Sequence, residues 1–492
     1  LRSPAGLGVN ALGELFYTEN QGGWVGTGYI AHVEKGDFFG HPSSLKSAGL
    51  PGSTVHLTNA DIPQDNPLFH DAVKRVKGMK MPSVRIPHGV LGKSTGGFVA
   101  DKNAYFGEFF KDQLFVGDEG MANIVRVAME KVNGAYQGVV FPFREGFVSG
   151  ILRMEWGADG ALFVGMSDRG WSSSGKERQG LERLVWTGKT PFEMKTVKAK
   201  SDGFEISFTL PVDTELALNP ESYTISSFDY RYHQQYGSNV EDLKPARITG
   251  IRLAPDGLSV RLVLDEMRAG YIYEIRCEGL RQKNENTPLL HPFGFYSLNA
   301  VPGNEYIDRN DPLFRMVTER EEKPTSGRDD TKEKSGTTNV VKGKQVSGMV
   351  SAGKGNKRVT RMPAAWTAGP DKTINIGTLP ELRFSLNQID VKPGAKIRLV
   401  FTNDDDMQHN LLIVLGGTTD EIGEAALKLG LKGPNMQYVP VSDKVLFHTS
   451  LLQPHSVETI YFEAPQKPGR YEYLCTYPGH YQTMRGILNV RE

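Results

Sequence analysis

The chain is poor in cysteine: only Cys277 and Cys475 occur among its 492 residues. Cys277 closes an alternating apolar segment, residues 271–277, whose pattern predicts a β-strand. We therefore expect Cys277 to be a buried small hydrophobe and not one half of a disulfide. Cys475 stands near the C-terminus, close to histidines and a methionine.

Other absences narrow the class of protein. No apolar run reaches about 18 residues, so the sequence predicts no membrane-spanning segment. The formal net charge is zero, with 57 basic and 57 acidic side chains, so global charge does not predict a nucleic acid or a charged membrane as partner. The sequence also lacks a Cys-x-x-Cys-His motif, a Walker loop, a GxSxG elbow and an HExxH helix. Covalent c-type haem is thereby excluded, and none of those enzyme signatures is available.

Glycine and proline are abundant, with 55 and 28 residues, and the hydrophobic content is 39 %. This composition favours turn-rich β structure over long helices. At roughly 150 residues per domain, the length suggests about three domains. We expect an all-β chain made of a partial β-propeller, an immunoglobulin-like β-sandwich and a second sandwich at the C-terminus.

The C-terminal segment carries a Cys–His–Met spacing. Four residues separate Cys475 from His480 and three more separate His480 from Met484, while His409 lies upstream. One thiolate, two imidazoles and one thioether are the ligands of a blue-copper electron-transfer site. A trigonal plane of two histidines and the cysteine, with a weak axial methionine, suits both Cu(I) and Cu(II). The set leaves no obvious open position for catalysis, and we therefore expect it to transfer single electrons.

Residues from about 370 to 492 resemble an azurin- or auracyanin-type cupredoxin. The similarity is carried by the segments 406–410, 445–449 and 473–480, followed by Met484. It implies that His409, Cys475, His480 and Met484 bind one type 1 copper. The azurin disulfide pair is missing, which leaves the copper ligands unaffected.

The resemblance also implies roles for the neighbours of the ligands. The Gln408 carbonyl would be a distant axial neighbour of the copper, and Asn410, with Thr476, would brace the ligand loop by hydrogen bonds. The His480 ring edge would lie near the surface as the electron port. The residues expected around that port are Met407, Tyr477, Pro478 and Gly479.

Local patterns predict the elements of this domain. Strands are expected at 385–391, 395–403 and 455–463. Apolar positions at helical spacing predict one helix at 419–429, capped by Thr419 or Asp420. We place the boundaries of the cupredoxin at 366–492.

Residues 1–190 repeat an apolar strand, a glycine-containing turn and a second apolar strand. Asp159-Gly160, between two apolar runs, is a strong hairpin signal. Recurring units of this kind predict propeller blades. The stretch resembles the blades of the soluble sugar-dehydrogenase family, and most closely its membrane-bound-dehydrogenase-like group. Because it holds about four blades at most, we expect an incomplete propeller completed by a missing N-terminal part or a partner chain.

The middle of the chain has two further regions. Residues 191–303 contain short strands at the spacing of a β-sandwich, resemble an immunoglobulin-like module and show no chemistry. Residues 304–365 are rich in Lys, Gly, Ser and Thr and predict a basic linker. A solvated tether is the main interpretation, and contact with an anionic surface or a neighbouring domain is the alternative.

Two polar clusters stand at strand ends of the propeller segment and could face a ligand in a central channel. The competing interpretation is that these side chains only form salt bridges and packing contacts between blades. His41 and His88, each of which stands beside Pro or Gly, have the same two interpretations. In the related dehydrogenases that channel can hold a quinone and calcium, but this sequence assigns neither. The clusters consist of Arg144, Glu145, Asp168, Arg169 and Trp171.

Three functional hypotheses remain at the level of sequence, and the least favoured of them is that the β modules are purely structural or ligand-binding and the copper is a passenger. In the first, copper relays electrons to or from a redox protein such as a cytochrome or a dehydrogenase, with the β domains as a docking scaffold. In the second, the propeller oxidises a sugar or alcohol and passes the electrons to copper. Because blue-copper proteins are normally exported, we expect a periplasmic or extracellular location and a missing N-terminal part before Leu1.

Overall fold

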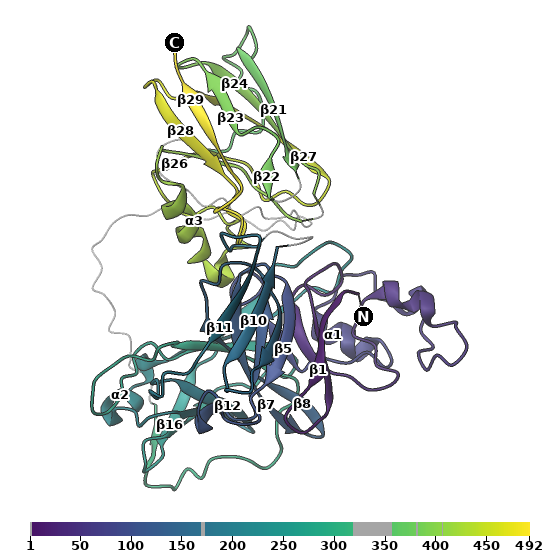
Figure 1. Cartoon of the computed structure of the whole chain (residues 1–492), viewed down its shortest axis with the longest axis vertical. Helices are drawn as coiled ribbons and strands as arrows, with labels where there is room; N and C mark the ends of the chain where they lie inside the picture. Colours follow the sequence, from purple (N-terminus) through teal and green to yellow (C-terminus); the bar gives the residue numbers. More distant parts are fainter. Residues whose placement is uncertain (1, 169–172, 318–356, 380–381, 406) are drawn as a thin grey trace, which may run out of the picture.

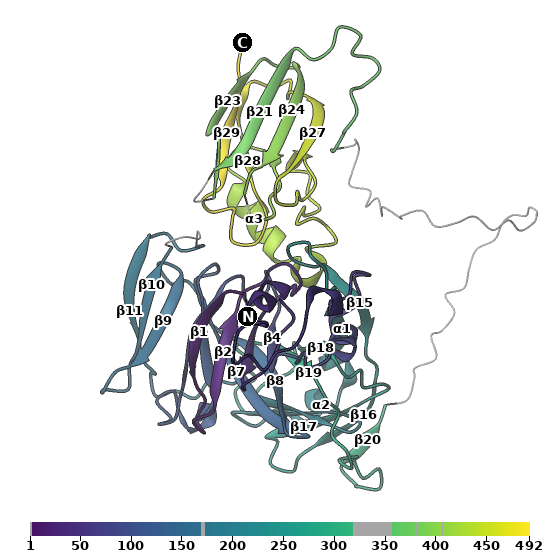
Figure 2. The ribbon, with the colours of Figure 1, turned by 90° about the vertical axis from the view of Figure 1, so that its right-hand side faces the viewer.

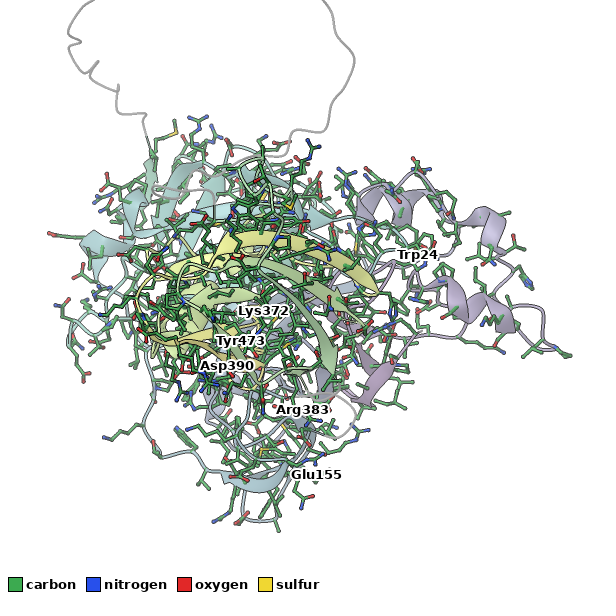
Figure 3. The ribbon with its side chains drawn as sticks, turned by 90° about the horizontal axis from the view of Figure 1, so that it is seen from above. Trp24, Glu155, Lys372, Arg383, Asp390 and Tyr473 are labelled. Atoms are coloured by element: carbon green, nitrogen blue, oxygen red, sulfur yellow. The ribbon has the colours of Figure 1, made fainter. Side chains whose placement is uncertain are left out.

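The computed structural model describes residues 2–168, 173–317, 357–379, 382–405 and 407–492. Strands dominate, and the described residues form two parts that are stacked along the long axis (Figures 1 and 2). We call residues 2–317 the N-terminal part and residues 357–492 the C-terminal domain. Figure 3 looks down this axis, with Lys372, Asp390 and Tyr473 labelled in the C-terminal domain and Trp24 and Glu155 in the N-terminal part.

Two sheets of the N-terminal part contain local hairpins, and in the first of them β4 joins from farther along the chain. At the predicted Asp159-Gly160 turn the Gly157 N–H donates to the carbonyl of Ala161 (2.8 Å), and Gly160 has a φ of 76°. This positive φ is accessible to glycine because it lacks a Cβ. The first sheet has the order β1 (Pro4–Val9), β2 (Leu15–Glu19), β3 (Gly28–His32), β4 (Val84–Ile86); the second has the order β11 (Gln179–Leu184), β10 (Leu162–Ser167), β9 (Ile151–Trp156).

An eight-stranded sheet crosses the boundary that the sequence places near residue 190. Its two halves join where Phe295 of one strand pairs with Val140 of another. The order is β15 (Val240–Pro245), β14 (Thr224–Tyr230), β18 (Tyr271–Arg276), β19 (Phe293–Leu298), β8 (Ala135–Arg144), β7 (Asn123–Val132), β6 (Leu114–Asp118), β5 (Thr95–Ala100). The β5–β8 unit is thus continuous with strands of the middle region, and no closed ring of blades is detected among the described residues.

A five-stranded sheet packs against half of the eight-stranded sheet. The aromatic rings of Phe204, Tyr273 and Tyr296 meet in the core between them. Cys277 is buried in the same core as a free cysteine, as its strand pattern predicts. The order of the sheet is β12 (Met194–Lys200), β13 (Gly203–Phe208), β17 (Ser259–Leu264), β16 (Ile248–Leu253), β20 (Phe314–Met316).

A buried ion pair fixes the first sheet against the eight-stranded one. Arg85 of β4 contacts Asp229 of β14 at 2.7 Å, and the opposite carboxylate oxygen of Asp229 contacts Nδ1 of His70, also at 2.7 Å. A buried carboxylate needs such partners, because an unpaired one is costly. The pair thereby fixes the end of β4 and the loop 87–92 that follows it.

The helices of the chain are short. In the N-terminal part the α-helices are α1 (Phe69–Arg75) and α2 (Thr214–Ala217), and the 3-10 helices are η1 (Pro42–Ser47), η2 (Asn59–Asp61), η3 (Glu108–Phe110) and η4 (Pro220–Ser222). The predicted C-terminal helix is present as α3 (Thr419–Leu427), with η5 (Gly430–Lys432) after it. Its N-cap is Thr418, without a side-chain capping bond, and not Thr419 or Asp420 as expected. Thr419 is already the first residue of the helix and is buried there, so the residue before it occupies the capping position.

The C-terminal domain is a sandwich of two sheets. Ile397, Leu399 and Phe401 alternate along one strand and point into the core between the sheets. One sheet has the order β22 (Arg383–Phe384), β21 (Lys372–Leu379), β24 (Lys396–Asn403), β27 (Ser456–Glu463). The other has the order β23 (Gln388–Val391), β29 (Arg485–Val490), β28 (Gly469–Leu474), β25 (Leu412–Val414), β26 (Val445–His448).

Both ends of the expected linker 304–365 contact a folded part. At its beginning β20 pairs with β16. At its end Lys357 donates to the Ser442 carbonyl (2.7 Å) and Arg358 pairs with Glu458; the next domain begins with Trp366, which packs on Tyr461. The rest of that segment, residues 318–356, lies outside the described residues.

Candidate metal centre

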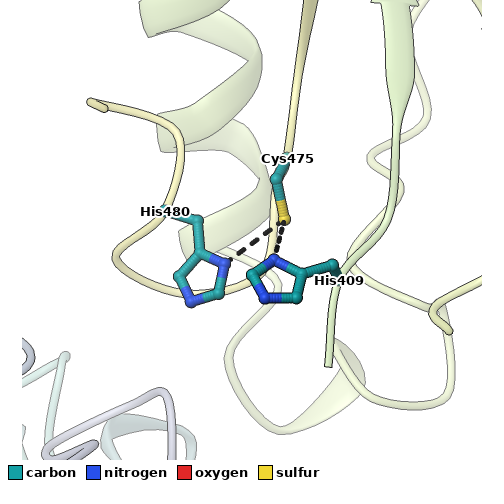
Figure 4. Close-up of side chains that lie close together, drawn as sticks. All are labelled: His409, Cys475 and His480. Carbon is teal, nitrogen blue, oxygen red and sulfur yellow. Dashed lines mark hydrogen bonds between the residues drawn. The ribbon is translucent and has the colours of Figure 1, made fainter. Parts of the chain in front are cut away.

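Four potential ligands meet at the end of the C-terminal domain that faces the N-terminal part. Cys475 directly follows β28, and the loop that continues through His480 and Met484 leads into β29. His409 stands between β24 and β25, where its backbone pairs with Leu452. Figure 4 shows the two imidazole rings turned toward the cysteine sulfur. The loop between β28 and β29 and the connection between β24 and β25 therefore bring together the four side chains that the sequence singles out.

The distances suit one metal ion. The Cys475 Sγ atom lies 3.8 Å from Nδ1 of His409 and 3.4 Å from Nδ1 of His480. The Met484 Sδ atom lies 3.1 Å from Nδ1 of His409. Two donors that are each about 2.1–2.3 Å from one ion and about 120° apart would lie roughly 3.6–4.0 Å from each other. The Cys475–His409 pair has this spacing, and the Cys475–His480 and Met484–His409 pairs are closer, so small outward shifts of His480 and Met484 would accommodate the ion. The donor types fit a copper ion bound through both Nδ1 atoms and the thiolate.

Burial sets the protonation of these side chains. All four are 0 % exposed. Burial lowers the pKa of His409 and takes the pKa of His480 well below its usual range, so both imidazoles are neutral and can donate a lone pair. Burial raises the pKa of the Cys475 thiol to about 12. Metal binding must therefore displace a proton from the sulfur, as it does whenever a thiol becomes a metal ligand.

Asn410 ties the ligand loop to the neighbouring chain. Its Oδ1 atom accepts from the Thr476 backbone N–H (2.8 Å), and its Nδ2 atom donates to the Gln437 carbonyl (2.9 Å). The Thr476 hydroxyl donates to the Tyr438 carbonyl (2.7 Å). These bonds hold the backbone next to Cys475 in place whether or not a metal is bound, so the donors are preorganised.

Asp405 is a neighbour of the site that sequence reasoning missed. One of its carboxylate oxygens lies 3.1 Å from Nε2 of His409. With Nδ1 turned toward the metal position, Nε2 carries the proton and donates it to this carboxylate, which fixes the ring orientation and raises its basicity. The sequence offered one signal for this role: Asp405 stands four residues before His409, within a run of three aspartates.

We predict that Asp405→Ala weakens copper binding by about 10- to 100-fold, the usual effect of losing such a partner. A competition titration against a chelator, followed by visible absorption, measures the change. Asp404→Ala is the matched control, because Asp404 is exposed and has no contact with a ligand side chain. Equal affinities for the two variants would contradict the role of Asp405.

The expected electron port is not at the surface. Tyr477, Pro478, Gly479 and Met407 are all buried, and Nε2 of His480 is buried without a hydrogen-bond partner among the described residues. The sequence prediction of an exposed ring edge is therefore wrong for this arrangement. The physical reason is that the N-terminal part covers this end of the sandwich.

Two loops of the N-terminal part form the cover. Nε2 of His88 lies 2.7 Å from the Tyr477 hydroxyl, so the histidine interpreted as merely structural contacts the ligand loop. A Cβ placed on Gly89 would lie 2.7 Å from Cγ of Pro478, which means that only glycine fits this approach. The second loop brings the Gly120 carbonyl to 3.4 Å from the position of a Cβ at Gly479. We call residues 87–93 and 119–120 the cover loops.

Apolar packing and a polar cleft complete this contact. Leu431 of η5 belongs to the same buried cluster as Ile86 and Leu91 of the N-terminal part. Beside it lies a polar cleft of about 450 Å³, lined on one side by residues including Arg231 and His233 and on the other by Gln408 and Gln453. Gln408 is therefore one of the residues that line the cleft, and the axial role of its carbonyl stays a prediction.

The propeller candidates do not form a common site. Arg144 is exposed at the end of β8, where it donates to the Phe143 carbonyl (2.6 Å), and Glu145 is exposed beside it. Asp168 instead faces Arg178 at 3.6 Å. Arg169 and Trp171 lie outside the described residues. Within the part of the chain that is described, His409, Cys475 and His480 form the only group of histidine, cysteine or acidic side chains close enough to hold a metal.

A search for long apolar helices gives no candidate for a membrane-spanning helix among the described residues.

Comparison with known proteins assigns the C-terminal domain. Residues 372–491 match the family described as copper binding proteins, plastocyanin/azurin family. Auracyanin-A from Chloroflexus aurantiacus is 33 % identical over 121 residues, which are 24 % of this chain and 74 % of auracyanin-A. Auracyanin-B from the same organism is 31 % identical over 127 residues, or 25 % of this chain and 53 % of auracyanin-B, so the chain spans about half the length of that relative.

A solved structure of auracyanin-A, titled a "blue" copper protein, is 33 % identical and aligns with 24 % of this chain and 98 % of its own, with a TM-score of 0.23. These similarities concern the C-terminal domain, and the sugar-dehydrogenase resemblance of the N-terminal part finds no confirmation among them. Proteins of this family, such as auracyanin and azurin, are blue-copper electron carriers. Through its C-terminal domain, the chain belongs to the plastocyanin/azurin family of copper-binding proteins, and its cofactor is a type 1 copper.

Proposed function

We propose that this protein is a one-electron carrier in which His409, Cys475, His480 and Met484 hold the copper. The observation that supports this most directly is the closed, buried donor set, with sulfur and nitrogen atoms 3.1–3.8 Å apart. When bound, the copper supplies one-electron redox chemistry at a site that favours neither oxidation state strongly. The surrounding side chains exclude water and hold the donors still, which keeps the reorganisation on electron transfer small.

The covered port constrains how the electron arrives. Because residues 477–480 are buried under the cover loops, a partner protein cannot touch the His480 edge in this arrangement. We propose that exchange with a partner takes place when the C-terminal domain separates from the N-terminal part. The composition of the 39 residues 318–356, rich in Lys, Gly, Ser and Thr, suits such a tether.

The partner in this proposal is a redox protein, a cytochrome or a dehydrogenase, which docks through a small interface typical of brief redox encounters. We also propose an exported protein, periplasmic or extracellular, in keeping with its relatives. The N-terminal part then serves as the docking scaffold. We also propose, as part of the same picture, that another segment or a partner chain supplies further propeller blades to the N-terminal part.

A second function deserves a direct test, because the copper port faces the N-terminal part. In this alternative the N-terminal part oxidises a sugar or alcohol and passes electrons to the copper. Anaerobic addition of a panel of sugars and alcohols to the oxidised, purified chain distinguishes the two. Loss of the blue colour with one of these substrates supports the enzyme, whereas bleaching only by a reduced redox protein supports the carrier.

We predict that Met484→Leu keeps copper and colour but raises the reduction potential. The axial thioether binds weakly and adjusts the potential more than it holds the metal. The swap conserves volume at a fully buried position, so its cost in stability is below about 1.5 kcal/mol. Spectroelectrochemical titration measures the shift, with Met362→Leu at an exposed methionine as the control. Loss of copper in Met484→Leu would refute the axial role.

A further inference from the structure

Lys93 is the charged side chain that the N-terminal part places against the copper loop. It follows the loop after β4 and is only 8 % exposed, although lysine is rarely buried. Its stem lies against Gly120, where an added Cβ would meet Lys93 Cδ at 2.8 Å. Its Nζ atom lies 3.9 Å from the position of a Cβ at Gly479 and 5.8 Å from the centre of the Tyr477 ring. The Lys93 side chain thus passes Gly120 of the other cover loop and brings its ammonium to the residue before His480.

This ammonium has no hydrogen-bond partner among the described residues. Three acids lie near it, Asp118, Asp405 and Glu119, and none of them forms a hydrogen bond with it. Asp118 accepts from the backbone N–H groups of Lys93, Ser94 and Met121, and Asp405 contacts His409. Glu119 lies near the Ser94 hydroxyl, and burial raises the pKa of its carboxyl to about 7. An unpaired buried cation is costly, so its position requires an explanation.

The explanation we give is its effect on the metal site. Burial lowers the pKa of Lys93 to about 8, and the nearby Cys475 sulfur is the largest influence in the opposite direction. A free thiolate at that position would attract the ammonium, but bound copper offsets this attraction. Bound Cu(II) and the thiolate together keep one net positive charge, whereas Cu(I) and the thiolate are neutral. The Lys93 charge therefore repels the oxidised site and not the reduced one.

We propose that Lys93 couples the redox state of the copper to the docking of the N-terminal part. This inference rests on the proposed carrier function. It adds a residue outside the cupredoxin domain that regulates the copper site. The positive charge stabilises the reduced form and so raises the reduction potential of the docked protein. Because such coupling is reciprocal, one-electron reduction by a partner tightens docking by the same free energy, and oxidation loosens it. The oxidised chain then exposes its port more often than the reduced chain.

The test uses the full chain loaded with copper. Lys93→Gln should lower the midpoint potential in a spectroelectrochemical titration, and Lys93→Arg, which keeps the charge, should stay close to the native value. Lys77→Gln removes an exposed lysine elsewhere on the N-terminal part and should have no effect. An unchanged or higher potential in Lys93→Gln overturns the proposal.

Hydrogen–deuterium exchange of residues 476–483 gives a second, independent readout. In the native chain this segment should exchange more slowly after reduction, and Lys93→Gln should remove that difference. Equal exchange in the two redox states of the native chain overturns the coupling. If the native chain takes up no copper and gives no redox titration, the carrier function itself is wrong. If the native chain titrates normally and Lys93→Gln has the same potential, only the role of Lys93 is wrong.

Discussion

Cys475→Ser abolishes the intense blue absorption of the oxidised protein. In this class of site the colour arises from charge transfer between the thiolate and Cu(II), so an alcohol at this position removes the electron donor of the transition. Cys475 is also fully buried between the two imidazoles, and the Met484 thioether beside them is only a weak ligand. We expect copper affinity to fall as well, because soft sulfur is what holds Cu(I).

The measurement is a visible absorption spectrum of copper-loaded protein, with the metal content determined separately. Cys277→Ser is the matched control, since Cys277 is the other buried free cysteine of the chain. That variant should keep the colour, although burying a hydroxyl costs about 1–3 kcal/mol of stability. A blue Cys475→Ser protein would show that another group is the sulfur ligand.

Gly89→Asn opens the cover and accelerates reduction of the copper by an external protein. A side chain at Gly89 meets Pro478 at 2.7 Å and the Tyr438 hydroxyl at 3.2 Å. Overpacking of this kind costs about 1–3 kcal/mol, and the cost applies only to the docked state. If partners react only with the separated state, the observed rate follows its population. Each 1.4 kcal/mol changes that population about tenfold, so we expect reduction to be roughly 10-fold faster.

Stopped-flow mixing of the oxidised chain with an excess of a reduced c-type cytochrome measures this rate. Gly78→Asn controls for the effect of asparagine on the backbone. Gly78 has nearly the same φ as Gly89, 78° against 72°, but no atom lies within 4 Å of the position that its Cβ would take. Asparagine tolerates this left-handed conformation, so the two variants differ mainly in the contact with Pro478. A slower reaction of Gly89→Asn would mean that electrons enter across the cover loops, and the separation model would be wrong.

The composition and motifs of the sequence determined the metal chemistry. Cys475, His480 and Met484 stand on one loop, so their spacing alone shows a donor set, and only His409 had to be brought from elsewhere. Local patterns likewise predicted α3 and the Asp159-Gly160 hairpin, because helical periodicity and turn chemistry act over a few residues. Strand pairing across long distances is different. The junction of Val140 with Phe295 merges a blade-like unit with the sandwich, and no local pattern encodes it.

What only the tertiary structure decided is the environment of the copper. The His88–Tyr477 contact joins residues 389 positions apart, and Lys93 reaches Gly479 across a similar separation. Such contacts depend on how two folded parts fit together, and a single histidine or lysine in a loop carries no trace of that fit. The sequence alone therefore predicted which residues supply the metal donors. The packing of the N-terminal part on the C-terminal domain decided that the port is covered, because burial is a property of the assembled surfaces.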